Sequence, residues 1–314
     1  MGERQIEGLA RPLASCDERL ESPGALQQSP ILPAILSIQS HVVYGHVGNS
    51  AAVFALQRLG REVWPIHTVQ FSNHTGYGAW RGRIFEAADI DDCVRGLSER
   101  GVLRECDGVL SGYVGSPEIG EAILRAVAAT HAANTHAVYC CDPVLGDAGR
   151  GLYVLAGVAE FIRERAIGAA TILTPNHFEL EFLSGAPLRR YEDARRALAA
   201  LHARGPRVIL VTSAELDETP SDCVEMLASE SGALWRLRTP KAPTKINGAG
   251  DVIAALFLAH WLASRNTADS LARAAASVYG LVRASAESGA GELALIAAQE
   301  EIVAPSHRFA PERI

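Results

Sequence analysis

The sequence predicts an α/β fold in three layers, a doubly wound and mostly parallel sheet with helices on both faces. Short apolar strands alternate with helical segments along most of the 314 residues. Hydrophobic residues make up 48% of the chain and aromatic residues only 6%, as in helices built from Ala, Val and Leu around a sheet. Polar or glycine-containing clusters follow the strands, and in open α/β sheets the ligand crevice lies at these carboxyl ends.

Residues 1–32 are expected to be a disordered N-terminal extension, and residues 33–314 a single domain. Prolines and glycines interrupt the extension, and its apolar residues show no sustained period. It also lacks the apolar core of a secretory signal. We therefore place the folded protein after residue 32.

The domain is expected to begin with a strand at residues 35–39, a helix at 50–59 and a second strand at 62–67, the order that starts a doubly wound sheet. Residues 70–77 are too polar for a core strand and are predicted to form a loop. A hairpin is expected around Ser231-Gly232. The further strands are expected at residues 109–110, 137–141, 171–173 and 207–211, and the further helices at 89–100, 117–130, 191–203, 251–263, 269–287 and 292–303.

Charge and composition exclude several classes of function. A net charge of −7 and a pI near 5.8 argue against nucleic acid or an anionic membrane as the main partner. No apolar run reaches the roughly 18 residues of a membrane span. The six cysteines show no CxxC pair and no metal-binding spacing. We expect reduced thiols in a cytoplasmic protein.

The most informative stretch is Asn247-Gly248-Ala249-Gly250-Asp251, which an almost wholly apolar run follows. A glycine turn at the start of a buried helix leaves amide N–H groups unpaired and pointing one way, which suits an anion. A carboxylate at that place cannot bind phosphate itself. Asp251 is therefore either a base, a holder of a metal or hydroxyl, or a plain helix N-cap.

An anion site beside an acid, with more carboxylates at strand ends, suggests phosphoryl transfer. Asp142, Asp147 and Glu179 could hold Mg²⁺ directly or through water. Each also has an ordinary explanation, since Asp142 could cap the turn before Pro143 and Glu179 could be an exposed helix residue. The sequence contains neither a P-loop nor a Gly-x-Gly-x-x-Gly after its first strand, and protein-kinase signatures are missing.

Several motifs together resemble the pyridoxal kinase family. They are Ser37 to Asn49 (SIQSHVVYGHVGN), Val69 to Tyr77 (VQFSNHTGY), Ser111-Gly112-Tyr113, Cys141 to Asp147 (CDPVLGD) and Thr174-Pro175-Asn176. The glycine turn resembles the catalytic turn of the wider ribokinase-like superfamily. The resemblance covers roughly residues 34 to 305 and implies a ribokinase-like fold.

The resemblance implies a kinase that transfers phosphate from ATP to the 5′-hydroxyl of pyridoxal and related B6 vitamers. Asp251 would be the base, with an anion hole from the amides of Gly248, Ala249 and Gly250. The substrate would contact Ser40, Val69, Phe71, Thr75, Gly76 and Tyr113. Asp142 and Glu179 would bind Mg²⁺ and the ATP phosphates. The nucleotide side of the site would be lined by Thr174, Thr212, Ser213, Thr239 and Lys241. The resemblance also implies a mobile flap at residues 147–153, a homodimer and a monovalent cation as a further cofactor.

This chain departs from the family at the nucleotide side. Thr212 stands where some bacterial relatives carry lysine. The two lysines of the chain, Lys241 and Lys245, lie just upstream of the glycine turn and could supply that charge.

Three other functions are weighed against the kinase that acts on pyridoxal. A hydroxymethylpyrimidine kinase would share the fold, but Phe71 and the loop after it favour a pyridine ring. A module that only binds B6 vitamers has no need of a base beside an anion hole. An NAD-dependent oxidoreductase would bind nicotinamide, and the sequence lacks its glycine motif.

Overall fold

The computed structural model describes residues 34–243, 246–289 and 291–314. The predicted extension at residues 1–32 and Lys245 lie outside these described residues. The described residues all belong to one compact unit. The domain boundary that the sequence predicts remains a prediction.

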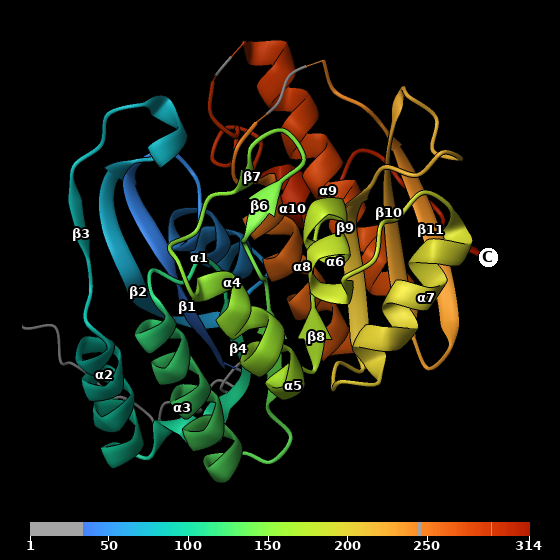
Figure 1. Cartoon of the computed structure of the whole chain (residues 1–314). Coiled ribbons are helices and arrows are strands. Elements are labelled where there is room, and N and C mark those ends of the chain that lie inside the picture. The colour runs from blue at the N-terminus through green and yellow to red at the C-terminus, as the bar shows by residue number, and fades with distance from the viewer. Residues whose placement is uncertain (1–33, 244–245, 290) are drawn as a thin grey trace, which may run out of the picture. The chain divides into compact units, whose positions relative to one another are not determined.

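One sheet of ten strands runs through the described part of the chain (Figure 1). The pairs among its central strands are parallel, whereas the pairs toward its two edges are antiparallel. The strand order is β12 (Glu312–Arg313), β11 (Ala233–Pro240), β10 (Cys223–Glu230), β9 (Val208–Ala214), β8 (Ile172–Leu173), β5 (Val138–Cys141), β4 (Cys106–Ser111), β1 (Ala34–Tyr44), β2 (Glu62–Asn73) and β3 (Gly82–Ile84).

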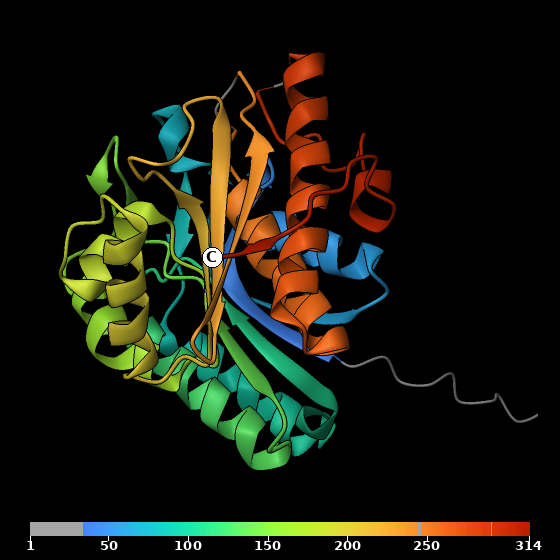
Figure 2. The same cartoon turned by 90° about the vertical axis from the view of Figure 1, so that its right-hand side faces the viewer.

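Helices cover both faces of this sheet (Figure 2). On one face lie α1 (Asn49–Arg58), α8 (Ala249–Ser264), α9 (Thr267–Ser288) and α10 (Glu300–Val303). On the other lie α2 (Ala87–Glu99), α3 (Pro117–Ala133), α4 (Val158–Phe161), α5 (Ile167–Ala169), α6 (His177–Ser184) and α7 (Tyr191–His202). Short turns of helix occur at η1 (Thr75–Tyr77), η2 (Val102–Glu105) and η3 (Ile162–Ala166). The predicted three-layer fold is confirmed.

The core is two apolar clusters, one on each side of the sheet. Successive residues of β1 alternate between them, since Leu36 and Ile38 belong to one cluster and Ile35 to the other. This is the period of two expected for a strand that is buried on both faces. Helix α8 is buried from Val252 to Ala259, as its almost wholly apolar sequence predicts.

The structure corrects two of the predicted elements. Strand β2 continues to Asn73, so Gln70 to Asn73 are strand residues rather than loop residues. Backbone pairing with β1 and β3 decides this, while Phe71 turns its side chain inward. Near the C-terminus the predicted helix at 292–303 is wrong, because only α10 is helical there. Leu293 and Leu295 are nevertheless buried against the second cluster, which explains the apolar pattern.

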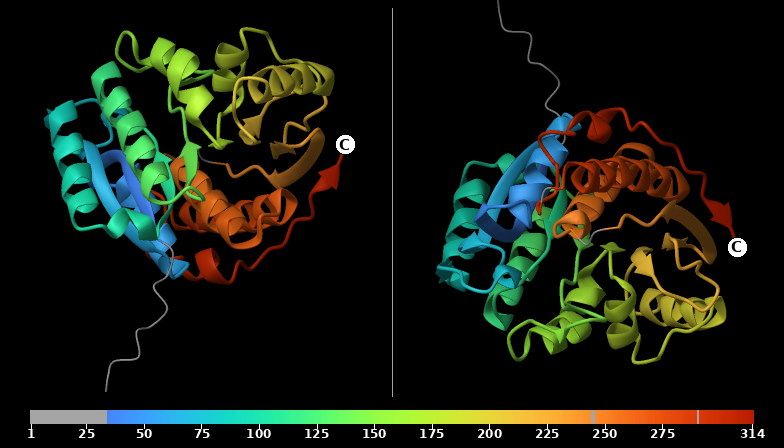
Figure 3. Two further views of the ribbon diagram at one scale, coloured as in Figure 1. Left: turned by 90° about the horizontal axis from the view of Figure 1, so that it is seen from below. Right: turned by 90° about the horizontal axis from the view of Figure 1, so that it is seen from above.

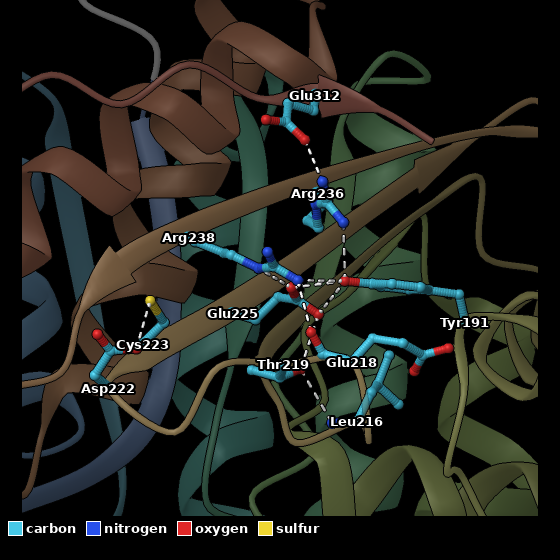
Figure 4. A network of polar contacts seen from close by, with 10 residues as sticks. All are labelled: Tyr191, Leu216, Glu218, Thr219, Asp222, Cys223, Glu225, Arg236, Arg238 and Glu312. Atoms are coloured by element: carbon cyan, nitrogen blue, oxygen red, sulfur yellow. Dashed lines mark hydrogen bonds and ion pairs between the residues drawn. The ribbon is translucent and has the colours of Figure 1, made fainter.

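A partly buried polar network, centred on Glu225, joins the hairpin of β10 and β11 to its surroundings (Figure 4). Glu225 on β10 is fully buried, and its carboxylate accepts hydrogen bonds from Tyr191 of α7, Thr219 and Arg238 of β11. Arg238 also donates to the carbonyl of Glu218 at 3.0 Å. One carboxylate therefore joins α7, the hairpin and the loop that leads into β10.

Candidate active site

A cavity of about 710 Å³ opens at the carboxyl ends of the parallel strands. In the view from above, this edge of the sheet faces the reader (Figure 3, right). Residues from widely separated segments line it because neighbouring parallel strands end at the same edge. They include Ser40 and Val42 of β1, Val69 and Phe71 of β2, Tyr113, Asp142, Thr174, Thr212 and the turn from Asn247 to Asp251.

The glycine turn forms one wall of the cavity. Gly248 is the N-cap of α8 with φ 90°, and no side chain caps this end of the helix. Val252 donates to the Gly248 carbonyl at 3.0 Å, so the amides of Gly248, Ala249 and Gly250 precede the intrahelical bonds. A side chain at Gly248 could not be accommodated, because its Cβ would lie 1.8 Å from the carbonyl oxygen of His46.

Asp251 is the third residue of α8, so the interpretation of this residue as a helix N-cap is wrong. The backbone N–H groups of Gly48 and of Asp251 itself lie near its carboxylate and favour its charged form. Burial nevertheless raises the pKa of Asp251 to about 6, since removal of water penalises the charged form more than these N–H groups favour it. A carboxyl with such a pKa can accept a proton near neutral pH.

Asp142 and Glu179 form a buried acidic pair, with side chains 7% and 3% exposed. Burial, together with the charges of Glu179 and Asp251, raises the pKa of Asp142 well above its usual range. Burial also raises the pKa of Glu179, to about 7, although its carboxylate accepts backbone N–H bonds from Leu145 at 2.7 Å and Asn176 at 2.9 Å. Glu179 is therefore buried, and the interpretation of it as an exposed helix residue is wrong. It also forms the capping box of α6 together with Asn176.

The acidic pair suits a divalent cation. Two buried carboxylates repel each other, and a cation between or beside them would relieve that repulsion. No group of three or more His, Cys, Asp or Glu side chains that could hold a metal occurs among the described residues. Mg²⁺ commonly uses one or two carboxylates and completes its shell with water and phosphate oxygens, so this pair fits it.

Another part of the cavity lining is apolar and aromatic. Val42, Val47, Val69 and Phe71 form a separate buried cluster, against which Tyr113 packs. The ring of Trp80 lies 4.1 Å from that of Phe71, centroid to centroid, with the planes tilted by 41°. A flat ring could stack in this space.

A hairpin of β6 (Gly146–Asp147) and β7 (Gly151–Leu152) borders the cavity where the sequence predicts a flap. One oxygen of Asp147 accepts the backbone N–H groups of Gly149 and Arg150, each at 3.0 Å. The Arg150 guanidinium pairs with the same carboxylate at 2.9 Å. Among the described residues that line the cavity, Arg150 is the one lysine or arginine.

Most residues that the sequence singles out lie together at this cavity. Every residue that the sequence assigns to phosphate transfer or to contact with the vitamer belongs to the cavity lining. Asp142, Thr174, Glu179 and Thr212 also line the cavity. Ser213, Thr239 and Lys241 do not belong to the lining; Thr239 is buried in β11, and the backbone of Lys241 bonds to Asp222 at 2.7 Å. A nucleotide role for these three remains a prediction.

The sequence reasoning missed several residues of the lining. No local sequence pattern marks Trp80 and Ile84 as site residues. They reach the cavity because the short strand β3 pairs with β2. Asn176 could have been found from its motif, since it is the N-cap of α6 and also bonds the Gly146 carbonyl at 2.8 Å. Val144 has a φ of 45°, a strained value for a β-branched residue, at the entrance to the flap.

Comparison with known proteins shows which family this site belongs to. The sequence profile described as phosphomethylpyrimidine kinase matches residues 104–295. The pyridoxal kinase PdxY of Granulibacter bethesdensis is 55% identical over 279 residues, which cover 88% of this chain and 98% of that protein. The pyridoxal kinase PdxY of Rubrobacter xylanophilus is 50% identical over 281 residues, covering 89% and 97%.

The chain belongs to the pyridoxal kinase family. A solved structure of pyridoxal kinase from Leishmania donovani in complex with ADP and pyridoxamine is similar in both sequence and fold, with 30% identity and a TM-score of 0.82. The match covers 90% of this chain and 99% of that one. No helix within the described ranges is long and apolar enough to cross a membrane.

Proposed function

We propose that this protein transfers the γ-phosphate of ATP to the 5′-hydroxymethyl group of pyridoxal, and of the related vitamers pyridoxine and pyridoxamine. The observation that carries the proposal is that Asp251 and the glycine turn line the same cavity as an apolar and aromatic cluster. The curated relatives named pyridoxal kinase support the choice of substrate.

In this mechanism Asp251 accepts the proton of the substrate hydroxyl. The freed oxygen attacks the γ-phosphorus, the bond to the β-phosphate oxygen breaks, and ADP leaves. Charge on the moving phosphoryl group is stabilised by the amides of Gly248, Ala249 and Gly250 and by the positive end of α8. These donors are fixed by the backbone before the substrate arrives, so they need no rearrangement during the reaction.

The vitamer ring is held by the aromatic and apolar wall. Val69, Phe71 and Tyr113 enclose its faces, while Ser40 and Thr75 meet its polar edge. Trp80 extends this wall beyond the predicted residues through its contact with Phe71. A ring held here presents its hydroxymethyl group toward the glycine turn, where Asp251 lies.

The nucleotide end of the cavity is assigned to Asp142, Glu179, Thr174 and Thr212, with the hairpin around Arg150 above them. Mg²⁺ held by Asp142 and Glu179 would neutralise charge on the ATP phosphates. We include a monovalent cation in the proposal, tested by replacing K⁺ with a bulky ammonium ion in the assay. Cytoplasmic location and a homodimer are also proposed, the latter tested by light scattering.

Side-by-side kinetics with ATP test the proposed substrate. We expect a clearly higher kcat/KM for pyridoxal than for hydroxymethylpyrimidine, with the 5′-phosphate as product. The profile match at residues 104–295 makes the pyrimidine the specific rival. A preference for the pyrimidine would replace the proposed substrate, and vitamer binding without turnover would indicate a binding protein.

A further inference from the structure

Glu292, in the segment between α9 and α10, joins two loops at the cavity. Its Oε1 accepts a hydrogen bond from the Tyr77 hydroxyl, and its Oε2 accepts the backbone N–H of His46 at 3.1 Å. Tyr77 ends the η1 turn that carries Thr75 and Gly76, whereas His46 lies in the loop between β1 and α1. A single carboxylate from a remote segment therefore holds both loops.

Both loops also contact the glycine turn. The Tyr77 hydroxyl lies close to the side chain of Asn247, which lines the cavity directly before Gly248. The His46 carbonyl packs so closely on Gly248 that a Cβ there would lie 1.8 Å from it. Glu292 is thus two contacts away from the amides that are proposed to stabilise the transferred phosphate.

Packing alone does not hold Tyr77 in place. Its side chain is 43% exposed, and its ring contact is an edge-to-face one with His74, at 5.9 Å between centroids. By contrast, Gly45 fits tightly over Glu292, since a Cβ there would lie 2.7 Å from the carboxylate. Bonds within the turn, such as that of the Gly76 N–H to the His74 ring at 3.2 Å, shape η1, and the Tyr77 hydroxyl adds its tie to Glu292.

We infer that Glu292 is a positioning residue, which latches the η1 turn through Tyr77 and so sets the vitamer end of the cavity against the glycine turn. The inference rests on the proposed function and adds a residue to it. Glu292 itself does not line the cavity, so it acts through Tyr77 and His46. Loss of the latch should weaken use of the vitamer and leave use of ATP nearly unchanged, because the nucleotide residues lie on other segments.

A double-mutant cycle of Tyr77→Phe and Glu292→Ala tests the latch. Each single change is expected to raise the KM for pyridoxal about tenfold, the effect of losing one hydrogen bond to a charged group, while the KM for ATP changes less than about twofold. The double variant should be no worse than Glu292→Ala, because both changes remove the same contact. Glu292→Gln keeps an oxygen that can accept the His46 N–H and offers an N–H to the Tyr77 oxygen. Its KM for pyridoxal should therefore rise about threefold at most.

Glu300→Ala is the matched control, because it removes an exposed carboxylate nearby that pairs with Arg58 at 2.9 Å. It should leave both KM values unchanged. Independent effects that multiply in the double variant, or equal rises in the KM for ATP, would overturn the inference.

Amide hydrogen exchange supplies a measurement that needs no turnover. In Glu292→Ala without substrates, residues 75–78 should exchange faster than in wild type and in Glu300→Ala. Unchanged exchange there would overturn the latch even if the KM rises. A wild-type protein that fails to phosphorylate pyridoxal would instead refute the proposed function, and the exchange result would still decide the role of Glu292.

Discussion

Among single residues, the proposed chemistry depends most on one carboxyl group whose surroundings suit a base. Asp251 loses hydration through burial and is only partly compensated by the N–H of Gly48. Burial also raises the pKa values of Asp142 and Glu179, and the negative charge of Glu179 raises the pKa of Asp142 further. Buried carboxyl groups are therefore proposed to serve two purposes, proton transfer at the glycine turn and cation binding at the neighbouring strand ends.

Asp251→Asn should reduce kcat by at least about a hundredfold, because an amide cannot accept the substrate proton. Binding of pyridoxal, measured by calorimetry, should be largely retained, since the ring contacts remain. Turnover close to that of wild type would place the base elsewhere.

The rate should also depend on pH through this group. Below a pKa of about 6 the Asp251 carboxyl is protonated and cannot act as a base. We expect kcat/KM for pyridoxal to fall about tenfold per pH unit below that point and to level off above it. Protein stability depends on pH in the opposite direction. The pKa of Asp251 is near 3.8 in the unfolded chain and about 6 in the folded protein, so the folded protein loses stability as the pH rises between these two values. At pH 8 the melting temperature of Asp251→Asn should therefore be no lower than that of wild type.

Among the helices and strands, the start of α8 and the β10–β11 hairpin show how backbone geometry and buried charge hold the site. Gly248 begins α8 with a positive φ against the His46 carbonyl. Glu225 secures the hairpin that follows β9, the strand whose Thr212 lines the cavity. Both features lie outside the proposed proton transfer but position the groups that surround it.

Gly248→Ala should nearly abolish activity and lower stability, because it combines an unfavourable φ with a backbone clash. Gly232→Ala is its control: Gly232 also has a positive φ, of 79°, but a Cβ there meets nothing within 4 Å. The control should cost about 1–2 kcal/mol of unfolding free energy and leave kcat intact. Comparable activity losses in both variants would mean that the clash with His46 is unimportant.

Glu225→Ala should destabilise the protein by about 1.5–3 kcal/mol in chemical denaturation, because it removes the charged hydrogen-bond partner of the Tyr191 hydroxyl and of Arg238, whose side chain is 30% exposed. Glu312→Ala, which removes an exposed partner of Arg236, should cost about 1 kcal/mol at most. Similar losses for the two variants would argue against Glu225 as the anchor of the hairpin.

Across the molecule as a whole, the fold gathers acidic groups from distant segments at one sheet edge. This concentration of negative charge destabilises the protein without ligands at neutral pH, and a divalent cation with nucleotide would reverse the effect. We therefore expect ligand binding and stability to be coupled through the cavity.

Mg²⁺ with ADP should raise the melting temperature more at pH 8 than at pH 5.5. At the lower pH, protons compete with the cation for Asp142 and Glu179, whose pKa values are both raised. At ligand concentrations about a hundredfold above Kd, the stabilisation should be about 2.7 kcal/mol. The double variant Asp142→Asn/Glu179→Gln should lose most of this shift and its pH dependence. A shift that is equal at both pH values would argue against cation binding by this pair.

Local sequence patterns are sufficient to predict the fold class and the sheet edge where the cavity lies, whereas most individual residues of the site follow from the resemblance to pyridoxal kinases. Strand periodicity, the buried helix after the glycine turn and the clusters at strand ends are local signals, and parallel strands bring such clusters to one edge. The strand-end pattern predicts that Ser40, Tyr113 and Asp142 lie at one site, and the resemblance adds Asp251; all four line the cavity.

Contacts that depend on pairing between distant segments follow only from the folded chain. The extension of β2, the place of Trp80 in the cavity and the bonds of Glu292 with Tyr77 and His46 arise from register and loop packing, which leave no mark on local sequence. The residues of the glycine turn by themselves likewise leave Asp251 open between a base, a holder of a metal or hydroxyl, and an N-cap. The backbone excludes the cap, because Gly248 takes the N-cap position and places Asp251 at the third residue of the helix, where it lines the cavity.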